Sequence, residues 1–123
     1  MARVLIVDDS PTETYKMTDI LSRHGYDVIA AESGEEGVAM AKKELPDLVL
    51  MDIVMPGING FQATRQLTKN ASTANIPVII VTTKDQETDR LWGKRQGAKG
   101  YLAKPVDEKL LIKTIEEALA ATT

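Results

Sequence analysis

Five polar side chains of the sequence each follow the end of a short apolar run, directly or after one residue. In chain order they are Asp8, Asp9, Asp52, Thr82 and Lys104. Three carboxylates that share one site repel each other unless a cation neutralises them, and carboxylate oxygens suit Mg²⁺, which also keeps several waters. These residue types therefore indicate a site for a divalent cation such as Mg²⁺, provided that the fold brings them together.

Each of these residues also has an ordinary structural explanation. An Asp-Asp pair before Ser-Pro is commonly a turn and helix cap, and a lysine before proline is usually a surface residue. Thr82 could be a β-branched residue at a strand end, and Asp52 could be a solvated acid in a loop. Only their matching positions after successive apolar runs favour the functional interpretation.

Alternating strands and helices must position these side chains. Aliphatic and β-branched runs predict strands, the second and last of them weaker and nearer the sheet edges, at residues 4–7, 26–31, 47–51, 77–81 and 100–103. Helical segments separate the runs, so right-handed βαβ crossovers predict a parallel sheet with helices on both faces. Ligands bind such sheets at the carboxyl ends of the strands. If the first and third strands are neighbours, Asp52 lies beside Asp8 and Asp9.

Capping residues mark where the helices begin and end. Ser10 as N-cap, with Pro11 next and Glu13 at the third helical position, predicts a helix start, and Gly25 predicts its end. A second capping box at 33–36 opens a helix that is predicted to run through Val38, Ala41 and Leu45 until Pro46 stops it. The remaining three helices are predicted to start at Asn59, near Asp85 and at Asp107.

Length and composition limit the class of protein. With 123 residues the chain fits a single domain, 1–123, and leaves no room for a separate output domain. Its apolar runs are too short to span a bilayer, and no signal peptide is recognisable at Met1-Ala2-Arg3. The net charge of -3 argues against direct binding to nucleic acid. The lack of cysteine agrees with a cytoplasmic protein.

Four motifs together resemble the signature of the response-regulator receiver family of two-component signalling. They are Val7-Asp8-Asp9-Ser10, Met51-Asp52-Ile53-Val54-Met55-Pro56-Gly57, Thr82-Thr83 and Lys104-Pro105. The resemblance covers essentially the whole chain and implies the doubly wound α/β fold of CheY-like receivers, a flavodoxin-like (βα)5 three-layer sandwich with strand order 2-1-3-4-5. More narrowly, residues 51–66 and 81–97 are similar to the receivers of type IV pilus twitching motility.

The family's chemistry is carried over onto the matching positions. Asp52 is expected to be the phosphorylated nucleophile. Mg²⁺ is expected to be held by Asp9 directly, by Asp8 directly or through water, by Asp52 and by the backbone carbonyl of Val54. Catalysis would then consist of positioning and charge neutralisation around an in-line phosphoryl group.

The same resemblance implies a conformational switch. Lys104 is expected to contact a phosphoryl oxygen, with a cis peptide bond to Pro105. Thr82 would donate its hydroxyl to the phosphoryl group, and Tyr101 would then turn inward and reshape the surface of the fourth helix, fifth strand and fifth helix. Without this switch, Tyr101 would be a half-exposed tyrosine on an edge strand.

A few positions depart from the common receiver pattern or stay open. Val54, Thr83 and Lys84 could crowd or exclude the hydrolytic water and so change the phosphoryl lifetime. Trp92 is predicted on the fourth helix, either as a core residue or as an exposed anchor for a partner. His24 is expected to be a surface residue at a helix end rather than a phosphorelay or metal site.

Partners and competing functions follow from this interpretation. A stand-alone regulator needs a phosphodonor, expected to be a histidine kinase of chemosensory type, and an unidentified protein target; we expect a monomer or weak dimer. A receiver fold that acts without phosphorylation is the main alternative. A magnesium-dependent phosphatase with an aspartate nucleophile is disfavoured, since its two acids stand two residues apart whereas Asp8 and Asp9 are adjacent. A flavin or nucleotide module is disfavoured because no glycine-rich loop follows the first strand.

Overall fold

Strands and helices alternate strictly along the chain in the computed structural model, which describes residues 1–122. The strands are β1 (Arg3–Val7), β2 (Asp27–Ala31), β3 (Leu48–Met51), β4 (Val78–Thr82) and β5 (Gly100–Ala103). The helices are α1 (Pro11–Arg23), α2 (Gly34–Glu44), α3 (Gly60–Lys69), α4 (Glu87–Arg95) and α5 (Glu108–Ala121). No helix among the described residues is long and apolar enough to span a lipid bilayer.

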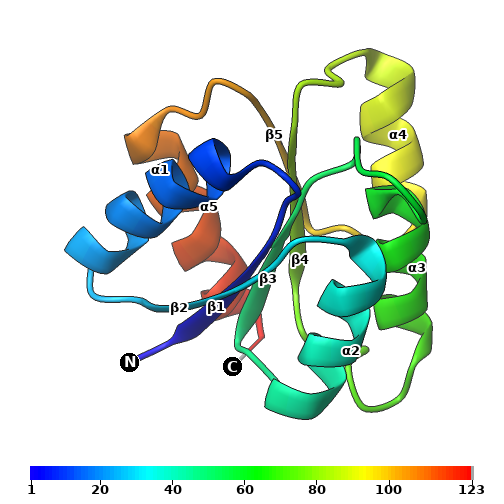
Figure 1. Ribbon diagram of the computed structural model, residues 1–123, viewed down its shortest axis with the longest axis horizontal. Coiled ribbons are helices and arrows are strands. Elements are labelled where there is room, and N and C mark those ends of the chain that lie inside the picture. Colours follow the sequence, from blue (N-terminus) through cyan, green and yellow to red (C-terminus); the bar gives the residue numbers. More distant parts are fainter. Residues whose placement is uncertain (123) are drawn as a thin grey trace.

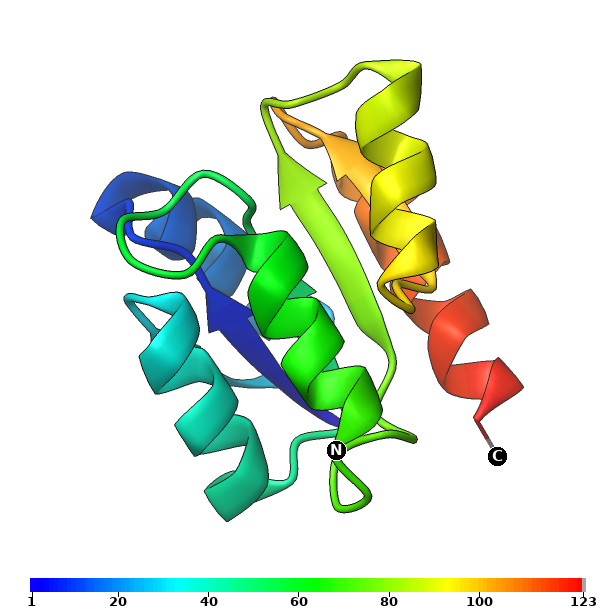
Figure 2. The ribbon, with the colours of Figure 1, turned by 90° about the vertical axis from the view of Figure 1, so that its right-hand side faces the viewer.

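The strands form one parallel sheet in the order β2-β1-β3-β4-β5, as predicted (Figure 1). Helices α1 and α5 cover one face, and α2, α3 and α4 cover the other, as Figure 2 shows. Val7 of β1 lies opposite Met51 of β3. The residues that follow these two, Asp8 and Asp52, therefore leave the sheet side by side.

The core is divided by the sheet into two apolar layers. Alternate residues of a strand point to opposite faces, so Val4 and Ile6 pack toward α1 and α5, whereas Leu5 and Val7 pack toward α2 and α3. Strands β3 and β4 are buried along their whole length, while the edge strands β2 and β5 are partly exposed. The predicted difference between central and edge strands is confirmed.

The predicted caps Ser10, Asn59 and Asp107 start their helices, whereas the end of α2 differs from the prediction. The Ser10 hydroxyl accepts the N–H of Glu13, and Asn59 and Asp107 cap α3 and α5 in the same way. The prediction that α2 runs through Leu45 was wrong by one residue: the helix ends at Glu44, and Leu45 caps it in a left-handed conformation (φ 48°) and is 55% exposed. Pro46 explains the break, because a residue before proline is disfavoured in the α conformation.

Both ends of the described chain lie at the edge of the sheet where β1 begins (Figure 1). Met1 and Ala2 line one cavity together with Leu119 and Thr122 of the C-terminal segment. The carboxyl ends of the strands, which carry the predicted site, lie at the opposite edge. The termini and the site are therefore separated by the length of the sheet.

Candidate functional site

Three aspartates converge at the carboxyl ends of β1 and β3. One carboxylate oxygen from each of Asp8, Asp9 and Asp52 lies within 4.8 Å of the other two. Asp8 and Asp52 are buried, with 1% and 7% of their surface exposed, whereas Asp9 is exposed. The predicted meeting of residues more than forty positions apart is confirmed, and it follows from the register of β1 against β3.

Asp8 is held rigidly by hydrogen bonds to both of its carboxylate oxygens. Its Oδ1 accepts a hydrogen bond from the backbone N–H of Ser10 at 2.9 Å, and its Oδ2 accepts one from Lys104 Nζ at 2.8 Å. The backbone N–H of Asp8 donates to the Ala31 carbonyl at 3.1 Å. Asp8 therefore acts as a fixed negative group at the base of the pocket and orients Lys104.

Lys104 reaches into the pocket from the end of β5. Its Nζ lies 3.5 Å from Asp52 Oδ2, and 8% of its side chain is exposed. Burial alone would lower the pKa of Lys104, but the hydrogen bond with Asp8 and the charge of Asp52 outweigh burial and raise the pKa. The peptide bond from Lys104 to Pro105 is cis, as predicted. The lysine is thus a permanent positive charge beside Asp52.

Asp52 has one carboxylate oxygen engaged by the backbone and one facing Lys104. Oδ1 accepts the Ile53 N–H at 2.8 Å, and Oδ2 is the atom near Lys104. Burial raises the pKa of Asp52 above its ordinary value; Lys104 opposes this shift, Asp8 adds to it, and a side-chain hydrogen bond from Thr82 lowers the pKa. Ionised Asp52 is therefore costly here without a further cation.

The pocket carries more negative than positive charge. Among residues 1–122, Lys104 is the one lysine or arginine within 4.0 Å of any of the three carboxylates, which leaves a formal charge of -3 + 1 = -2. Hard carboxylate oxygens at the mouth of a polar pocket are the ligand type that Mg²⁺ takes in proteins. The donor set fits a divalent cation. The role expected for the Val54 carbonyl stays a prediction.

Thr82 connects the acidic pocket to Tyr101 through the loop after β4. Its buried hydroxyl accepts the Lys84 N–H at 3.4 Å, and the Tyr101 hydroxyl donates to the Lys84 carbonyl at 2.5 Å. The Tyr101 ring packs on the small apolar cluster of Ile53, Phe61 and Ile80. Burial, followed by the charge of Asp89, raises the pKa of Tyr101 to about 12, so the hydroxyl remains a donor at neutral pH.

Sequence reasoning missed two residues that shape the site. Arg90 lies over the Tyr101 ring at 5.1 Å, donates to the Tyr101 carbonyl at 3.1 Å and bonds Asp85 at 2.8 Å. A Cβ at Gly60 would lie 2.0 Å from the carbonyl oxygen of Asp52, so α3 can approach the strand end only with glycine there. The Asn59-Gly60 pair carried that signal, whereas no sequence spacing indicated Arg90.

The remaining singled-out residues lie outside the acidic pocket. Val54, Thr83 and Lys84 are exposed, and Lys84 Nζ lies 3.9 Å from Asp89 Oδ1. His24 is exposed and contacts Glu108, so its predicted surface position is confirmed. Trp92 is 49% exposed, which favours the exposed one of its two predicted positions.

Comparisons with known proteins agree with this architecture. Residues 4–116 match the response regulator receiver domain family. The chain is 71% identical to protein PilH of Pseudomonas aeruginosa, over 98% of this chain and 99% of PilH. It is also 38% identical to the response regulator PleD of Caulobacter vibrioides, over 89% of this chain but 24% of PleD.

Solved structures show the same arrangement of strands and helices. The chemotaxis protein CheY4 of Vibrio cholerae superposes with a TM-score of 0.90 at 32% identity, over 96% of this chain and 98% of CheY4. A CheY-like receiver domain protein of Methanospirillum hungatei superposes with a TM-score of 0.92 at 30% identity, over 99% and 96% of the two chains. The predicted flavodoxin-like fold is therefore confirmed. This chain belongs to the response regulator receiver domain family.

Proposed function

We propose that this chain is a stand-alone response regulator that accepts a phosphoryl group on Asp52 from a histidine kinase, with the help of Mg²⁺. Family membership supports a phosphoacceptor signalling role with a histidine kinase as partner. The observation that carries the residue assignment is the Asp52 carboxylate itself, which faces Lys104 in a pocket with two further carboxylates. The proposed unit is one receiver domain, residues 1–123.

The proposed phosphoryl transfer uses side chains that already lie around the Asp52 carboxylate. Asp52 Oδ2 is the attacking atom in our proposal, because Oδ1 is engaged by the Ile53 N–H. A new bond forms between this oxygen and phosphorus while the bond from phosphorus to the kinase histidine nitrogen breaks, and that nitrogen keeps the electron pair and takes a proton. Lys104 offsets charge on the phosphoryl oxygens, and the Thr82 hydroxyl can donate to one of them.

Asp8, Asp9 and Asp52 would hold the magnesium ion, together with the Val54 carbonyl. Receiver domains typically bind Mg²⁺ at an aspartate cluster of this kind, and the charge deficit of the pocket supports the same assignment here. When bound, the ion supplies positive charge that lets the carboxylates and the incoming phosphoryl group share one site. Asp8 would keep its present role of orienting Lys104.

The proposed output is a change in the surface formed by α4, β5 and α5. A phosphoryl group that accepts a hydrogen bond from the Thr82 hydroxyl would replace Asp52 as its acceptor and would draw the hydroxyl away from the Lys84 N–H that donates to it. The Lys84 backbone carbonyl in turn accepts a hydrogen bond from the Tyr101 hydroxyl. A movement of the loop that carries Lys84 would therefore change the position of the Tyr101 ring. The contact chain from Thr82 to Tyr101 supports this switch, in which the phosphoryl group shifts the population between two loop positions.

The pathway proposed is control of type IV pilus twitching motility or a related chemosensory response in the cytoplasm. The 71% identity to PilH over nearly the whole of both chains supports it. The kinase would then be of chemosensory type and the output a regulated contact with another protein, made by a monomer or weak dimer. Phosphotransfer rates compared among candidate kinases test this pathway separately from the receiver chemistry.

Labelling with radioactive acetyl phosphate tests the phosphorylation site. Wild type should be labelled in Mg²⁺ and not in EDTA, and Asp52→Asn should not be labelled at all. Asp19→Asn, the same chemical change on the exposed face of α1, is the matched control and should behave as wild type. Equal labelling of Asp52→Asn and wild type would refute the assignment, and unlabelled wild type would support a receiver fold that acts without phosphorylation. Turnover of a generic phosphomonoester would instead support a phosphatase.

A further inference from the structure

The edge strand β2 has an outer side that no other strand covers within residues 1–122. It pairs only with β1 in this part of the chain. The Asp27 N–H donates to the Ala2 carbonyl, and the Ala31 carbonyl accepts from the Asp8 N–H. Asp27 and Ala31 therefore direct their backbone groups toward β1. Backbone groups of successive strand residues alternate in direction, and Val28 and Ala30 therefore direct theirs outward. Such a row of free donors and acceptors is a template for another strand.

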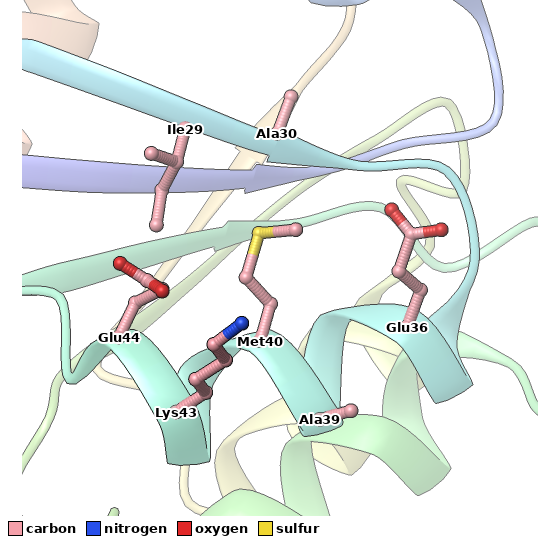
Figure 3. A pocket seen from close by; sticks show the side chains of 7 residues that line it. All are labelled: Ile29, Ala30, Glu36, Ala39, Met40, Lys43 and Glu44. Carbon is pink, nitrogen blue, oxygen red and sulfur yellow. The ribbon is translucent and has the colours of Figure 1, made fainter.

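A groove runs between this edge and α2. It has a volume of about 520 Å³ and is lined by Ile29, Ala30, Glu36, Ala39, Met40, Lys43 and Glu44. Figure 3 shows the Met40 side chain reaching from α2 toward the strand and Ile29 pointing into the same space, while Ala30 points to the other side of β2. The floor of this groove is apolar.

A second groove lies on the opposite face of β2, toward α1. It has a volume of about 460 Å³, and Ala30 lines it together with Thr14, Tyr15 and Thr18. Tyr15 is 75% exposed beside it. Because side chains alternate along a strand, a sixth strand added along β2 would direct its successive side chains into the two grooves in turn.

The charges around the free edge of β2 indicate which kind of segment can bind there. Asp27, Glu32 and Glu36 are exposed there, Lys43 is the one basic residue that lines either groove, and Glu44 is already paired with Arg3. A second copy paired antiparallel would bring Asp27 near Glu32 of the copy, and like charges that meet across strands are destabilising. The acidic rim instead complements positive side chains.

We propose that the free edge of β2 binds an extended segment of another protein in which apolar and basic residues alternate. Backbone hydrogen bonds to Val28 and Ala30 would provide the pairing, and the two grooves with their acidic rim would provide the selectivity, which is the usual division in strand addition. This surface lies at the opposite edge of the sheet from β5, and Asp8 of the acidic site also lines the second groove.

Titration with a labelled acetyl-Lys-Val-Lys-Val-Lys-Val-Lys-amide peptide tests the proposal by fluorescence anisotropy and amide hydrogen exchange. We expect saturable binding, with at least tenfold slower exchange of the Val28 and Ala30 amides, and no binding of the peptide with glutamate in place of lysine. Glu32→Lys combined with Glu36→Lys should weaken binding at least tenfold and admit the glutamate peptide. Glu117→Lys, the same charge change on α5, should alter the affinity less than twofold.

A backbone variant separates strand pairing from simple charge attraction. Ala30→Pro removes an outward N–H but no bond to β1, and edge strands tolerate proline at such positions. It should fold with wild-type circular dichroism and bind the lysine peptide at least tenfold more weakly. The proposal is overturned if the Val28 and Ala30 amides are not protected at saturation, or if Glu117→Lys weakens binding as much as the double variant. Concentration-dependent protection of these amides without peptide would show that a second copy occupies the edge, and would also overturn it.

Discussion

Asp52 combines burial with a negative charge for which Lys104 is the one neighbouring cation among residues 1–122. Its raised pKa means that the folded state holds a proton on Asp52 more tightly than the unfolded state does. The stability of the metal-free protein should therefore fall as pH rises from the ordinary aspartate pKa through the higher pKa of the folded state. The proposed phosphorylation needs the ionised form, so the residue proposed to accept the phosphoryl group also costs stability.

Asp52→Asn should stabilise the metal-free protein. The amide keeps the shape of the side chain but removes a buried charge beside Asp8, and Lys104 keeps its closer partner. We expect the free energy of unfolding at pH 7 in EDTA to rise by about 1 kcal/mol, and the difference from wild type to disappear below about pH 3.5. Urea unfolding monitored by circular dichroism measures both. A less stable variant at pH 7 would show that attraction to Lys104 outweighs burial.

Arg90→Ala should loosen Tyr101 without affecting the acidic pocket. Arg90 contacts the Tyr101 ring, the Tyr101 carbonyl and Asp85, and so ties α4 to β5 and to the loop between β4 and α4. We expect broadened or shifted ring resonances of Tyr101 in NMR spectra, an unchanged rate of labelling by acetyl phosphate, and a stability loss of about 1 kcal/mol or less.

Arg95→Ala, on an exposed position of the same helix, is the control for Arg90 and should leave the Tyr101 ring unchanged. Identical ring spectra for wild type and Arg90→Ala would contradict the role given to Arg90. Arg90→Lys keeps the charge but lacks the planar fork that reaches three groups at once, so it should resemble the alanine variant more than wild type.

Between elements, one surface cluster joins the end of α1 to the start of α5. Glu108 accepts hydrogen bonds from Arg23 at 3.0 and 3.1 Å and contacts His24 at 2.9 Å. The bonds from Arg23, followed by that from His24, lower the pKa of Glu108 to about 2. Because the folded pKa is depressed, this contribution to stability is present above about pH 4.5 and is lost as pH falls toward 2.

Wild type should therefore be more stable than Glu108→Gln at pH 5, and this difference in the free energy of unfolding should shrink as the pH falls to 2. About 40% of the Glu108 side chain is exposed, so salt at about 1 M should shrink the difference. Urea unfolding across this pH range measures it, with Glu117→Gln on α5 as the control. A difference that does not change with pH would mean that the cluster acts through packing instead of charge.

The sequence predicted the strands and the main site because both depend on local patterns. Apolar runs define where each strand ends, and the chemistry of a parallel sheet lies at those ends, which is why Asp8, Asp52 and Lys104 were found. The end of α2 was predicted too late, because Leu45 fits the apolar spacing and only the conformation before Pro46 excludes it. The start of α4 was predicted within two residues, since Gln86 instead of Asp85 is its cap.

Contacts between distant segments could not be predicted in this way. Arg90 meets Tyr101 across eleven positions because α4 packs beside β5, and no spacing rule gives that direction. The Glu36 side chain accepts the Glu32 N–H instead of completing the predicted box with Ser33. The hydrogen-bond partner of such a side chain depends on which group lies nearest to it in the folded chain.

For the whole molecule, magnesium should act as a stabilising ligand. An ion that binds only the folded state raises the free energy of unfolding by about 2.7 kcal/mol at a concentration of 100 Kd. The melting temperature of wild type should rise with Mg²⁺, whereas Asp9→Asn should respond much less because it lacks a carboxylate at the pocket mouth. Asp19→Asn should respond as wild type does. Equal responses of wild type and Asp9→Asn would place the ion elsewhere.

The position of the chain ends has a practical consequence. Met1, Ala2 and Thr122 lie together at the edge of the sheet opposite the aspartates. A biotin tether or a fluorescent protein joined to either end would hold the molecule by that edge and leave Asp52 facing the solution. Protein immobilised in this way can be presented to candidate kinases on a sensor chip, and the fold determines its orientation.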